Sequence, residues 1–396
     1  MNILFVQRSI ACIGGVMVVT NVIAKKMIEH GHQVSQVVFK TPNEEAIKLM
    51  DSRIHQYVVG SLNYTSHNRG YFNTIIEKEN IDVVINQWGL NIKVGRFVKQ
   101  ALETHNFKVI SVYHNQPNKN GHLTNIELAL KTNLSIYSRC KYVFMKKCIE
   151  IASRFSMRYI YNMSDVFMVL SDSFIPIFQQ YVKIKNAPKL VSLPNPLTIY
   201  TDVYEFDSST KKKEIIFVGR LDETQKKIIR ILEIWKKTSK LIPDWKLILV
   251  GDGSARLQSE IYVRDNKIDN VDFEGFQNPT DYYKRASILI LASDFEGFGL
   301  VIVEGMAFGV VPVVYNSYAA AADIITQGKD GILVDKSENE EVIVKKMSEA
   351  LFCLCTDLDK REYMAKNAMV KARSYNVDSI YKKWEYYLKL LKNKKS

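Results

Sequence analysis

The sequence predicts an α/β protein built from two doubly wound domains. Three observations lead to this prediction. Short runs of β-branched and other apolar residues alternate with helical stretches, which is typical of parallel strands joined by crossover helices. The alternation stops once, in a segment rich first in proline and then in polar residues, and afterwards it restarts. The length of 396 residues is too large for one ordinary core and suits two.

The first half of the chain opens with the apolar run Asn2–Gln7, followed by Gly14, Gly15 and a helical stretch at Val18–His30. Further apolar runs predict strands at Gln33–Phe39, Asp82–Asn86, Lys108–Tyr113, Val166–Leu170 and Leu190–Leu193. Because longer segments separate these runs, we expect a parallel sheet with crossover helices. Residues 1–197 are predicted to form the first domain, and residues 198–213 a linker.

The second half repeats the pattern. Strand-like runs occur at Glu214–Val218, Trp245–Val250, Val271–Glu274, Ile288–Leu291, Val310–Tyr315 and Ile332–Val334, with a helix at Lys227–Lys240. Residues 214–376 are predicted to form the second domain, and residues 377–396 a C-terminal amphipathic helix. Open α/β sheets bind ligands at the carboxyl ends of their strands, so we expect the chemistry in a cleft where the two domains face each other.

Charge is distributed unevenly between the two halves. The net charge is +12, and residues 1–195 hold 23 Lys and Arg against 12 Asp and Glu, whereas residues 196–396 hold 31 against 30. An excess of this kind indicates that the first half faces something anionic. Nucleic acid, a membrane surface and a phosphorylated acceptor are the candidates.

The chain lacks the signs of export. No window of 18 uninterrupted apolar residues predicts a transmembrane helix, and the N-terminus has neither a cationic leader nor a cleavage signal. The five cysteines, Cys12, Cys140, Cys148, Cys353 and Cys355, are odd in number and have no Cys-x-x-Cys spacing, so we expect free thiols in a reducing compartment. These features favour a cytoplasmic protein.

The strongest chemical motif runs from Ser293 to Pro312. A predicted strand ends just before it, and a helix is expected to begin near Leu300, which places Gly297 and Gly299 at a strand-to-helix turn. The free N–H groups and the dipole of such a helix can hold a diphosphate. Glu296 precedes the turn and Glu304 lies in the helix. The structural alternative is a tight connection with a surface glutamate.

A second motif, Gly219-Arg220-Leu221 followed by Lys226, also lies where a strand leads into a helix. Its cations could neutralise a leaving diphosphate, or they could simply be solvated. Gly251, in the turn after the next strand, and the Gly14-Gly15 pair are weaker signals for a phosphate site. The pattern Gly-x-Gly-x-x-Gly is absent after the first strand, which argues against an NAD dehydrogenase.

Two further features lie in the first half. His114 directly follows a predicted strand and is expected to face the cleft, although it could be an ordinary loop histidine. The stretch Lys131–Arg158 carries seven cations and one acid, Glu150, interleaved with apolar residues. This pattern is compatible with an interfacial basic helix and equally with a core helix that has a charged outer face.

Taken together, these motifs resemble glycosyltransferase family 4, whose members have the GT-B fold of two Rossmann-like domains. The resemblance covers nearly the whole chain, and it extends through Gly309 with Pro312, Asn316–Tyr318, Asp323–Ile325 and Asp330–Val334. It implies a C-terminal helix that crosses back to the N-terminal domain, which binds the acceptor, while the C-terminal domain binds the nucleotide sugar.

The resemblance also implies residue roles. His114, Arg220, Lys226 and Glu296 would be catalytic: the two cations hold the donor diphosphate, Glu296 holds the transferred sugar, and His114 lies near the reacting centre. Glu304 would bind the ribose hydroxyls. The remaining donor contacts would come from Gly14, Gly15, Gly219, Gly251, Phe298, Gly299 and Leu300.

The implied activity is transfer of a hexose or N-acetylhexosamine, with retention of configuration and without a metal or other cofactor. A UDP-sugar is preferred over a GDP-sugar as donor. The acceptor would be a glycan or a lipid-linked glycan in surface polysaccharide or glycoconjugate synthesis. The stretch Lys131–Arg158 would hold the enzyme peripherally on the inner face of the cell membrane, and no nucleic acid is expected as a partner.

The sequence departs from the family pattern at three places. Val16–Val18 replaces the usual Glu-Arg after the two glycines, which leaves the acceptor contacts open; Lys227 and Ala319–Ala322 replace glycines elsewhere. The alternatives are a glycoside hydrolase using Glu296 and Glu304, and a non-catalytic nucleotide- or membrane-binding protein. The retained Arg220 and Lys226 argue against both. Nucleic-acid binding would explain the basic half but not the diphosphate motifs.

Overall fold

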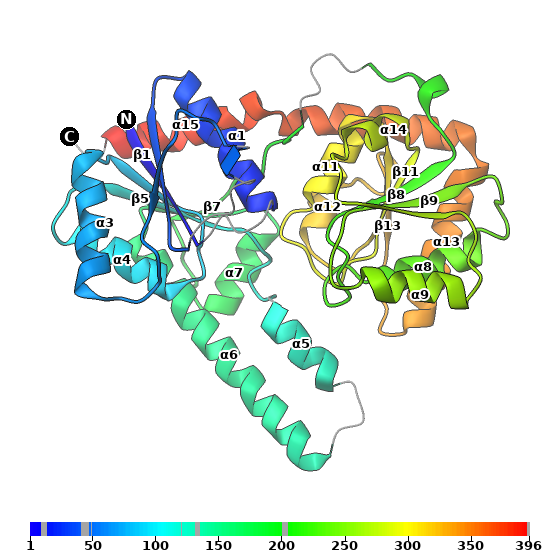
Figure 1. Cartoon of the computed structure of the whole chain (residues 1–396), viewed down its shortest axis with the longest axis horizontal. Coiled ribbons are helices and arrows are strands. Elements are labelled where there is room, and N and C mark those ends of the chain that lie inside the picture. Colours follow the sequence, from blue (N-terminus) through cyan, green and yellow to red (C-terminus); the bar gives the residue numbers. More distant parts are fainter. Residues whose placement is uncertain are drawn as a thin grey trace. The chain divides into compact units, whose positions relative to one another are not determined.

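The protein consists of two compact units. The computed structural model describes residues 1–8, 14–40, 47–48, 50–119, 121–130, 135–199 and 205–393 (Figure 1). The first unit comprises residues 1–198 together with residues 377–396, and the second comprises residues 199–376. The segment expected as a linker thus lies largely within the second unit. Lys211 fastens it there by donating hydrogen bonds to the carbonyls of Tyr283 at 2.9 Å and Phe308 at 2.7 Å.

The first unit is built on a seven-stranded parallel sheet. Its strands are β1 (Asn2–Gln7), β2 (Gln33–Val38), β3 (His55–Val58), β4 (Val83–Asn86), β5 (Lys108–Tyr113), β6 (Val166–Val169) and β7 (Leu190–Ser192). They lie in the order β3-β2-β1-β4-β5-β6-β7, so the direction of winding reverses between β1 and β4. Six of these strands were predicted to within one residue at each end. The edge strand β3 was missed because its side chains are half-buried and form no apolar run.

Helices surround this sheet and bury its apolar faces. They are α1 (Gly15–Glu29), α3 (Ser66–Lys78), α4 (Ile92–Leu102), α5 (Gly121–Leu130), α6 (Ile136–Met163), α7 (Phe174–Val182) and α15 (Val377–Asn393). The C-terminal helix α15 packs against α1, as expected from the fold class. Lys26 of α1 forms an ion pair of 2.6 Å with Asp378, and the rings of His30 and Tyr381 stack at 4.2 Å.

Helices α5 and α6 form a hairpin that extends away from the sheet of the first unit (Figure 1). All buried residues of α6 lie near its C-terminal end, between Ser156 and Tyr161. Most of the large apolar side chains before that point are exposed, among them Phe144 at 70% and Phe155 at 63%. The interpretation of this stretch as a core helix is therefore wrong for residues 136–155, because the described structure buries none of their side chains, although α5 lies against this part of the helix. Lys131 lies outside the described residues.

The second unit contains a six-stranded parallel sheet. Its strands are β8 (Glu214–Val218), β9 (Lys246–Val250), β10 (Val271–Gly275), β11 (Ile288–Leu291), β12 (Val311–Tyr315) and β13 (Ile332–Val334). Their order is β10-β9-β8-β11-β12-β13, so the winding reverses between β8 and β11. The central strands are almost completely buried, which explains why they read as continuous apolar runs in the sequence.

The helices of the second unit cover the two faces of its sheet. They are α8 (Ile228–Thr238), α9 (Arg256–Asp265), α10 (Thr280–Arg285), α11 (Leu300–Ala307), α12 (Ala320–Ile324), α13 (Glu340–Thr356) and α14 (Leu358–Ala372). Cys140, Cys148, Cys353 and Cys355 are free, as predicted, and Cys12 is outside the described residues. Nowhere in the described chain is a helix long and apolar enough to cross a membrane.

Candidate active site

The predicted chemical motifs of the second unit meet where its sheet changes winding direction. The loop after β8 carries Gly219, Arg220 and Lys226, and the loop after the neighbouring strand β11 carries Glu296 and Gly299. Loops that leave adjacent strands on opposite faces at such a point separate and leave a crevice for a ligand. Parallel pairing of β8 and β11 therefore joins two motifs that lie about 70 residues apart.

An ion pair between Lys226 and Glu296 is the centre of this region. The Lys226 Nζ lies 2.6 Å from the Glu296 Oε1, and the two side chains are only 13% and 8% exposed. Gln225 supports the pair: its Nε2 donates to the Glu296 Oε2 at 3.3 Å and to the carbonyl of Phe295 at 3.1 Å. The cation is thus held in place before any ligand arrives. This role of Gln225 was not predicted, since an amide side chain is common on loops.

Arg220 lies beside this pair with most of its surface open to solvent. Its side chain is 63% exposed, and its Nη2 is 3.5 Å from the Gln225 Oε1 and 3.7 Å from the Asp222 Oδ2. These are long contacts, so the guanidinium keeps unused donors for an anionic ligand. The structure thus brings together three of the four residues predicted to be catalytic.

Helix α11 begins at the same turn. Its N-cap is Gly299, with φ of 96°, and no side chain caps the helix. The N–H of Ile302 donates to the Gly299 carbonyl at 2.9 Å, so the N–H groups before it in the first turn are the ones suited to an anion. Leu300 is the first helical residue. The Phe298 ring packs against Tyr375 at 5.6 Å, which leaves only its backbone for a ligand. Glu304, one turn further along, is buried and accepts a hydrogen bond from the Tyr283 hydroxyl at 3.1 Å.

The glycines after β8 and β9 are needed for backbone packing. A Cβ atom built on Gly251 would lie 1.8 Å from the carbonyl oxygen of Gly219, which is an impossible contact. Both residues also have positive φ, 142° for Gly251 and 150° for Gly219. Close approach of the two loops therefore explains both glycines without a ligand. Their donor contacts remain a prediction.

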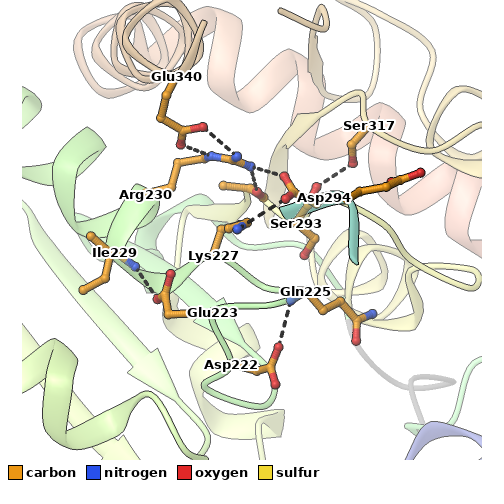
Figure 2. A network of polar contacts seen from close by, with 12 residues as sticks. Asp222, Glu223, Gln225, Lys227, Ile229, Arg230, Ser293, Asp294, Ser317 and Glu340 are labelled. Atoms are coloured by element: carbon orange, nitrogen blue, oxygen red, sulfur yellow. Dashed lines mark hydrogen bonds and ion pairs between the residues drawn. The ribbon is translucent and has the colours of Figure 1, made fainter. Parts of the chain in front are cut away.

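A buried arginine holds the β11 loop in position (Figure 2). Arg230 of α8 is 5% exposed and donates to the Ala292 carbonyl at 2.6 Å and the Asp294 Oδ1 at 2.8 Å, and it forms a two-pronged pair with Glu340. Lys227 adds a contact of 3.5 Å to Asp294 from a left-handed conformation with φ of 57°. This network was not predicted, because Arg230 resembles a solvated helical cation in the sequence.

His114 and the two N-terminal glycines lie in the first unit. His114 follows β5, and its Nε2 lies 2.5 Å from the Oε1 of Gln87, which follows β4. Burial lowers the pKa of His114 to about 4, so the ring is neutral at physiological pH. Its Nδ1 is buried without a partner. Gly14 is the N-cap of α1 and Gly15 its first residue.

The second unit thus presents fixed cations and an uncapped helix N-terminus at one end of its sheet, an arrangement suited to a diphosphate. Within the described ranges, no three His, Cys, Asp or Glu side chains are grouped so that they could hold a metal ion.

Comparisons with known proteins agree with this reading. A sequence profile described as "Glycosyl transferases group 1" matches residues 202–370. A Campylobacter jejuni protein, GalNAc-α-(1→4)-GalNAc-α-(1→3)-diNAcBac-PP-undecaprenol α-1,4-N-acetyl-D-galactosaminyltransferase, is 29% identical over 269 residues, which are 67% of this chain and 71% of that protein.

Solved structures share the fold over almost the whole chain. A variant of S. aureus TarM, in complex with Fondaparinux, α-GlcNAc-glycerol and UDP, has a TM-score of 0.73 at 14% identity and covers 98% of this chain and 99% of its own. Anabaena Alr3699/HepE in complex with UDP-glucose has a TM-score of 0.73 at 16% identity, with the same shares covered. The fold is therefore GT-B, and residues 202–370 match the profile of the group 1 glycosyltransferases.

Proposed function

We propose that the protein transfers a hexose or N-acetylhexosamine from a UDP-sugar to a glycan or lipid-linked acceptor, with retention of anomeric configuration. The observation that carries the proposal is the preformed Lys226–Glu296 pair, with Arg220 beside it, at the uncapped N-terminus of α11. Three sources of positive potential converge there, which suits the diphosphate of a nucleotide sugar. In this proposal Glu304, held by Tyr283, accepts hydrogen bonds from the ribose hydroxyls.

The proposed mechanism depends on the leaving group, which is the nucleoside diphosphate. The bond between the anomeric carbon and the phosphate oxygen breaks, and its electron pair stays on the nucleoside diphosphate. Arg220, Lys226 and the α11 dipole stabilise this growing negative charge, so no metal is required. The acceptor hydroxyl then bonds to the same face of the sugar, and its proton passes to the departing phosphate oxygen. The neutral His114 contributes a hydrogen bond near the sugar, without acting as a cation.

The choice of donor and acceptor draws on the relatives. The TarM structure contains UDP and the HepE structure contains UDP-glucose, which supports a uridine donor over a guanosine one. The C. jejuni relative is named for a PP-undecaprenol-linked glycan and for α-1,4-N-acetyl-D-galactosaminyl transfer, which supports a lipid-linked acceptor and an N-acetylhexosamine donor here. An amylovoran biosynthesis glycosyltransferase of Erwinia amylovora is 27% identical over 194 residues, 48% of this chain and 51% of that protein, which supports a role in surface polysaccharide assembly.

The same proposal includes docking on the inner, anionic face of the cell membrane through α6. Tyr137, Phe144, Ile151 and Phe155 are exposed, and their spacing of seven, seven and four residues places them on one face of the helix. The exposed cations Lys141, Lys147 and Arg158 lie beside that stripe. An apolar stripe flanked by cations suits a surface of anionic lipid, where each cation contributes about 1 kcal/mol.

Liposome co-sedimentation tests the docking. We expect binding to vesicles with phosphatidylglycerol and little binding to neutral phosphatidylcholine vesicles, with a steep loss as salt rises. The double variant Phe144→Ser/Phe155→Ser and the triple variant Lys141→Ser/Lys147→Ser/Arg158→Ser should each release the protein. A control with Lys345→Ser and Lys366→Ser on the second unit should bind normally. Equal binding to both vesicle types would contradict the proposal.

Assays with radiolabelled UDP- and GDP-sugars test the activity. Arg220→Ala and Lys226→Ala should each lower kcat by roughly 10²–10³, because each removes a preorganised contact to developing charge. EDTA should have no effect, and NMR of the product should show the anomeric configuration of the donor. Hydrolysis of simple glycosides without a nucleotide would favour the hydrolase alternative. Nucleotide binding without transfer to any acceptor would favour the non-catalytic one, and salt-sensitive binding to duplex DNA would favour a nucleic-acid role.

A further inference from the structure

The hydroxyl of Tyr318 is buried in the second unit and has no hydrogen-bond partner. The side chain is 1% exposed, and its Oη contacts no donor or acceptor among the described residues. Burial, together with the nearby negative charge of Glu296, raises the pKa of this phenol, so it stays protonated. Leaving a buried hydroxyl without a hydrogen-bond partner is unfavourable, because the group has lost its hydration and gained nothing in exchange. A group of this kind in a well-packed unit requires an explanation.

The hydroxyl points at the turn that opens α11. A Cβ atom built on Gly299, the N-cap of α11, would lie only 2.7 Å from the Tyr318 Oη. The absence of a side chain at Gly299 therefore leaves the room that the phenol uses. The segment that carries Tyr318 is also tied to the loop after β11, because the Ser317 Oγ donates to the carbonyl of Ser293 at 2.5 Å (Figure 2). Packing against Gly299 and the bond from Ser317 to Ser293 together fix the position of the phenol.

Unpaired buried hydroxyls gather at this turn. In the described part of the second unit, three buried side-chain polar atoms have no partner: the hydroxyls of Ser259, Ser293 and Tyr318. Ser259 lies on α9, whereas Ser293 lies two residues beyond the end of β11, in the loop that leads to α11. Two of the three therefore flank the candidate diphosphate site. A ligand with acceptor oxygens at this turn would give the buried Tyr318 hydroxyl the hydrogen-bond partner that it lacks.

We propose that the Tyr318 hydroxyl is a further donor-binding contact, which donates a hydrogen bond to a diphosphate oxygen of the nucleotide sugar. The inference rests on the proposed function and names a residue for the same site. A protonated phenol beside the carboxylate of Glu296 suits a ligand oxygen that only accepts, as phosphate oxygens do. The uncapped N–H groups of α11 approach the same oxygens from the backbone side, so the phenol completes a ring of donors.

The proposal predicts opposite effects on binding and on stability. Tyr318→Phe removes one hydroxyl and keeps the ring, so its packing is unchanged. In the unliganded protein no hydrogen bond is lost, and the melting temperature should stay equal or rise. In the complex a charge-assisted bond is lost, and the affinity for UDP should fall roughly tenfold or more. A hydroxyl with a merely structural role would lower stability and leave UDP affinity unchanged.

Isothermal titration of the full chain with UDP tests this contact, with thermal unfolding measured on the same samples. The matched control is Tyr262→Phe on α9. It removes a hydroxyl that donates to Glu233 of α8 at 3.2 Å, and the variant should bind UDP like the wild type. Equal UDP affinity in Tyr318→Phe and wild type would overturn the proposal. Unchanged UDP affinity with weaker UDP-sugar binding would also overturn it and assign the hydroxyl to the sugar. If the wild type bound no UDP, the proposed function itself would fail.

Discussion

Replacement of Arg230 by methionine should destabilise the second unit and loosen the site at the same time. The guanidinium is 5% exposed and donates to the Ala292 carbonyl, to Asp294 and to Glu340. Methionine fills a similar volume, so the perturbation is chiefly the loss of charge and of donors. Ala292 is buried and its carbonyl loses this donor, while Asp294 keeps only the 3.5 Å contact to Lys227.

The magnitude follows from these contacts. Glu340 is half exposed and can be solvated, so its share is small. An unpaired buried carbonyl contributes about 1–3 kcal/mol, and breaking a buried ion pair by removing one partner about 3–5 kcal/mol in all. We expect a total loss of about 3–5 kcal/mol. For a unit of this size, that corresponds to a fall in Tm of roughly 6–20 °C.

Urea unfolding followed by tryptophan fluorescence measures the effect, since Trp235 and Trp245 lie in the second unit. The matched control is Arg264→Met. The side chain of Arg264 is 73% exposed, so its loss should change the free energy of unfolding by less than about 1 kcal/mol. UDP affinity should also fall in Arg230→Met. Arg230 holds Asp294, whose N–H donates to the carbonyl of Gln225 at 2.9 Å, and Gln225 in turn supports Glu296 of the site. Equal stability of the two variants would refute this reading of the network.

Three further predictions concern loop packing, the C-terminal helix and His114. Gly251→Ala should destabilise the second unit by more than about 2 kcal/mol, since the added Cβ would lie 1.8 Å from the Gly219 carbonyl oxygen. As a control, a Cβ added at Gly121 has no atom within 4 Å, so Gly121→Ala should leave the melting temperature unchanged. Trp384→Ala should lower the free energy of unfolding by about 3–5 kcal/mol. Because α15 packs in the first unit, hydrogen-exchange protection should fall in α1 but not in α8. An equal loss of protection in both helices would contradict this prediction. The pKa of His114 is about 4 in the folded protein and about 6.5 in the unfolded chain, so the unfolded chain takes up a proton first as the pH falls. The free energy of unfolding should therefore fall by up to about 3 kcal/mol between pH 6.5 and 4. The same dependence of the unfolding free energy on pH in His114→Asn would contradict the assignment.

Buried strands were predictable because each is a short apolar run with turn residues at its ends. β11 was predicted with its observed ends, and β12 begins one residue later than expected. β3 has no such run and could not be recognised. α8 begins at Ile228 rather than at Lys227, because Lys227 adopts the left-handed conformation and is the N-cap of the helix.

The residues that carry charge at strand ends were predictable, but their partners were not. Arg220, Lys226 and Glu296 stand out because cations and acids follow buried strands. The contact between Arg230 and Glu340 joins residues 110 positions apart, and nothing in a single sequence indicates that they meet. The same holds for Tyr283 beside Glu304 and for Tyr318 beside Gly299, which the fold alone brings together.

The basic stretch in the first unit shows a different limit. Periodicity showed that α6 has an apolar face, and two interpretations stayed open because coverage of that face depends on neighbouring elements. The end near Met157 and Ile160 is buried, while Phe144 and Phe155 are exposed. Exposure of a helix face is a tertiary property and requires the structure.

A crystal structure of the full chain with UDP would locate the phosphates of the donor. We expect the diphosphate to lie at the N-terminus of α11, within hydrogen-bond distance of the Gly299 backbone and the side chains of Lys226 and Arg220. The ribose should then contact Glu304. UDP bound elsewhere on the protein, with no phosphate oxygen near Lys226 or Gly299, would contradict it.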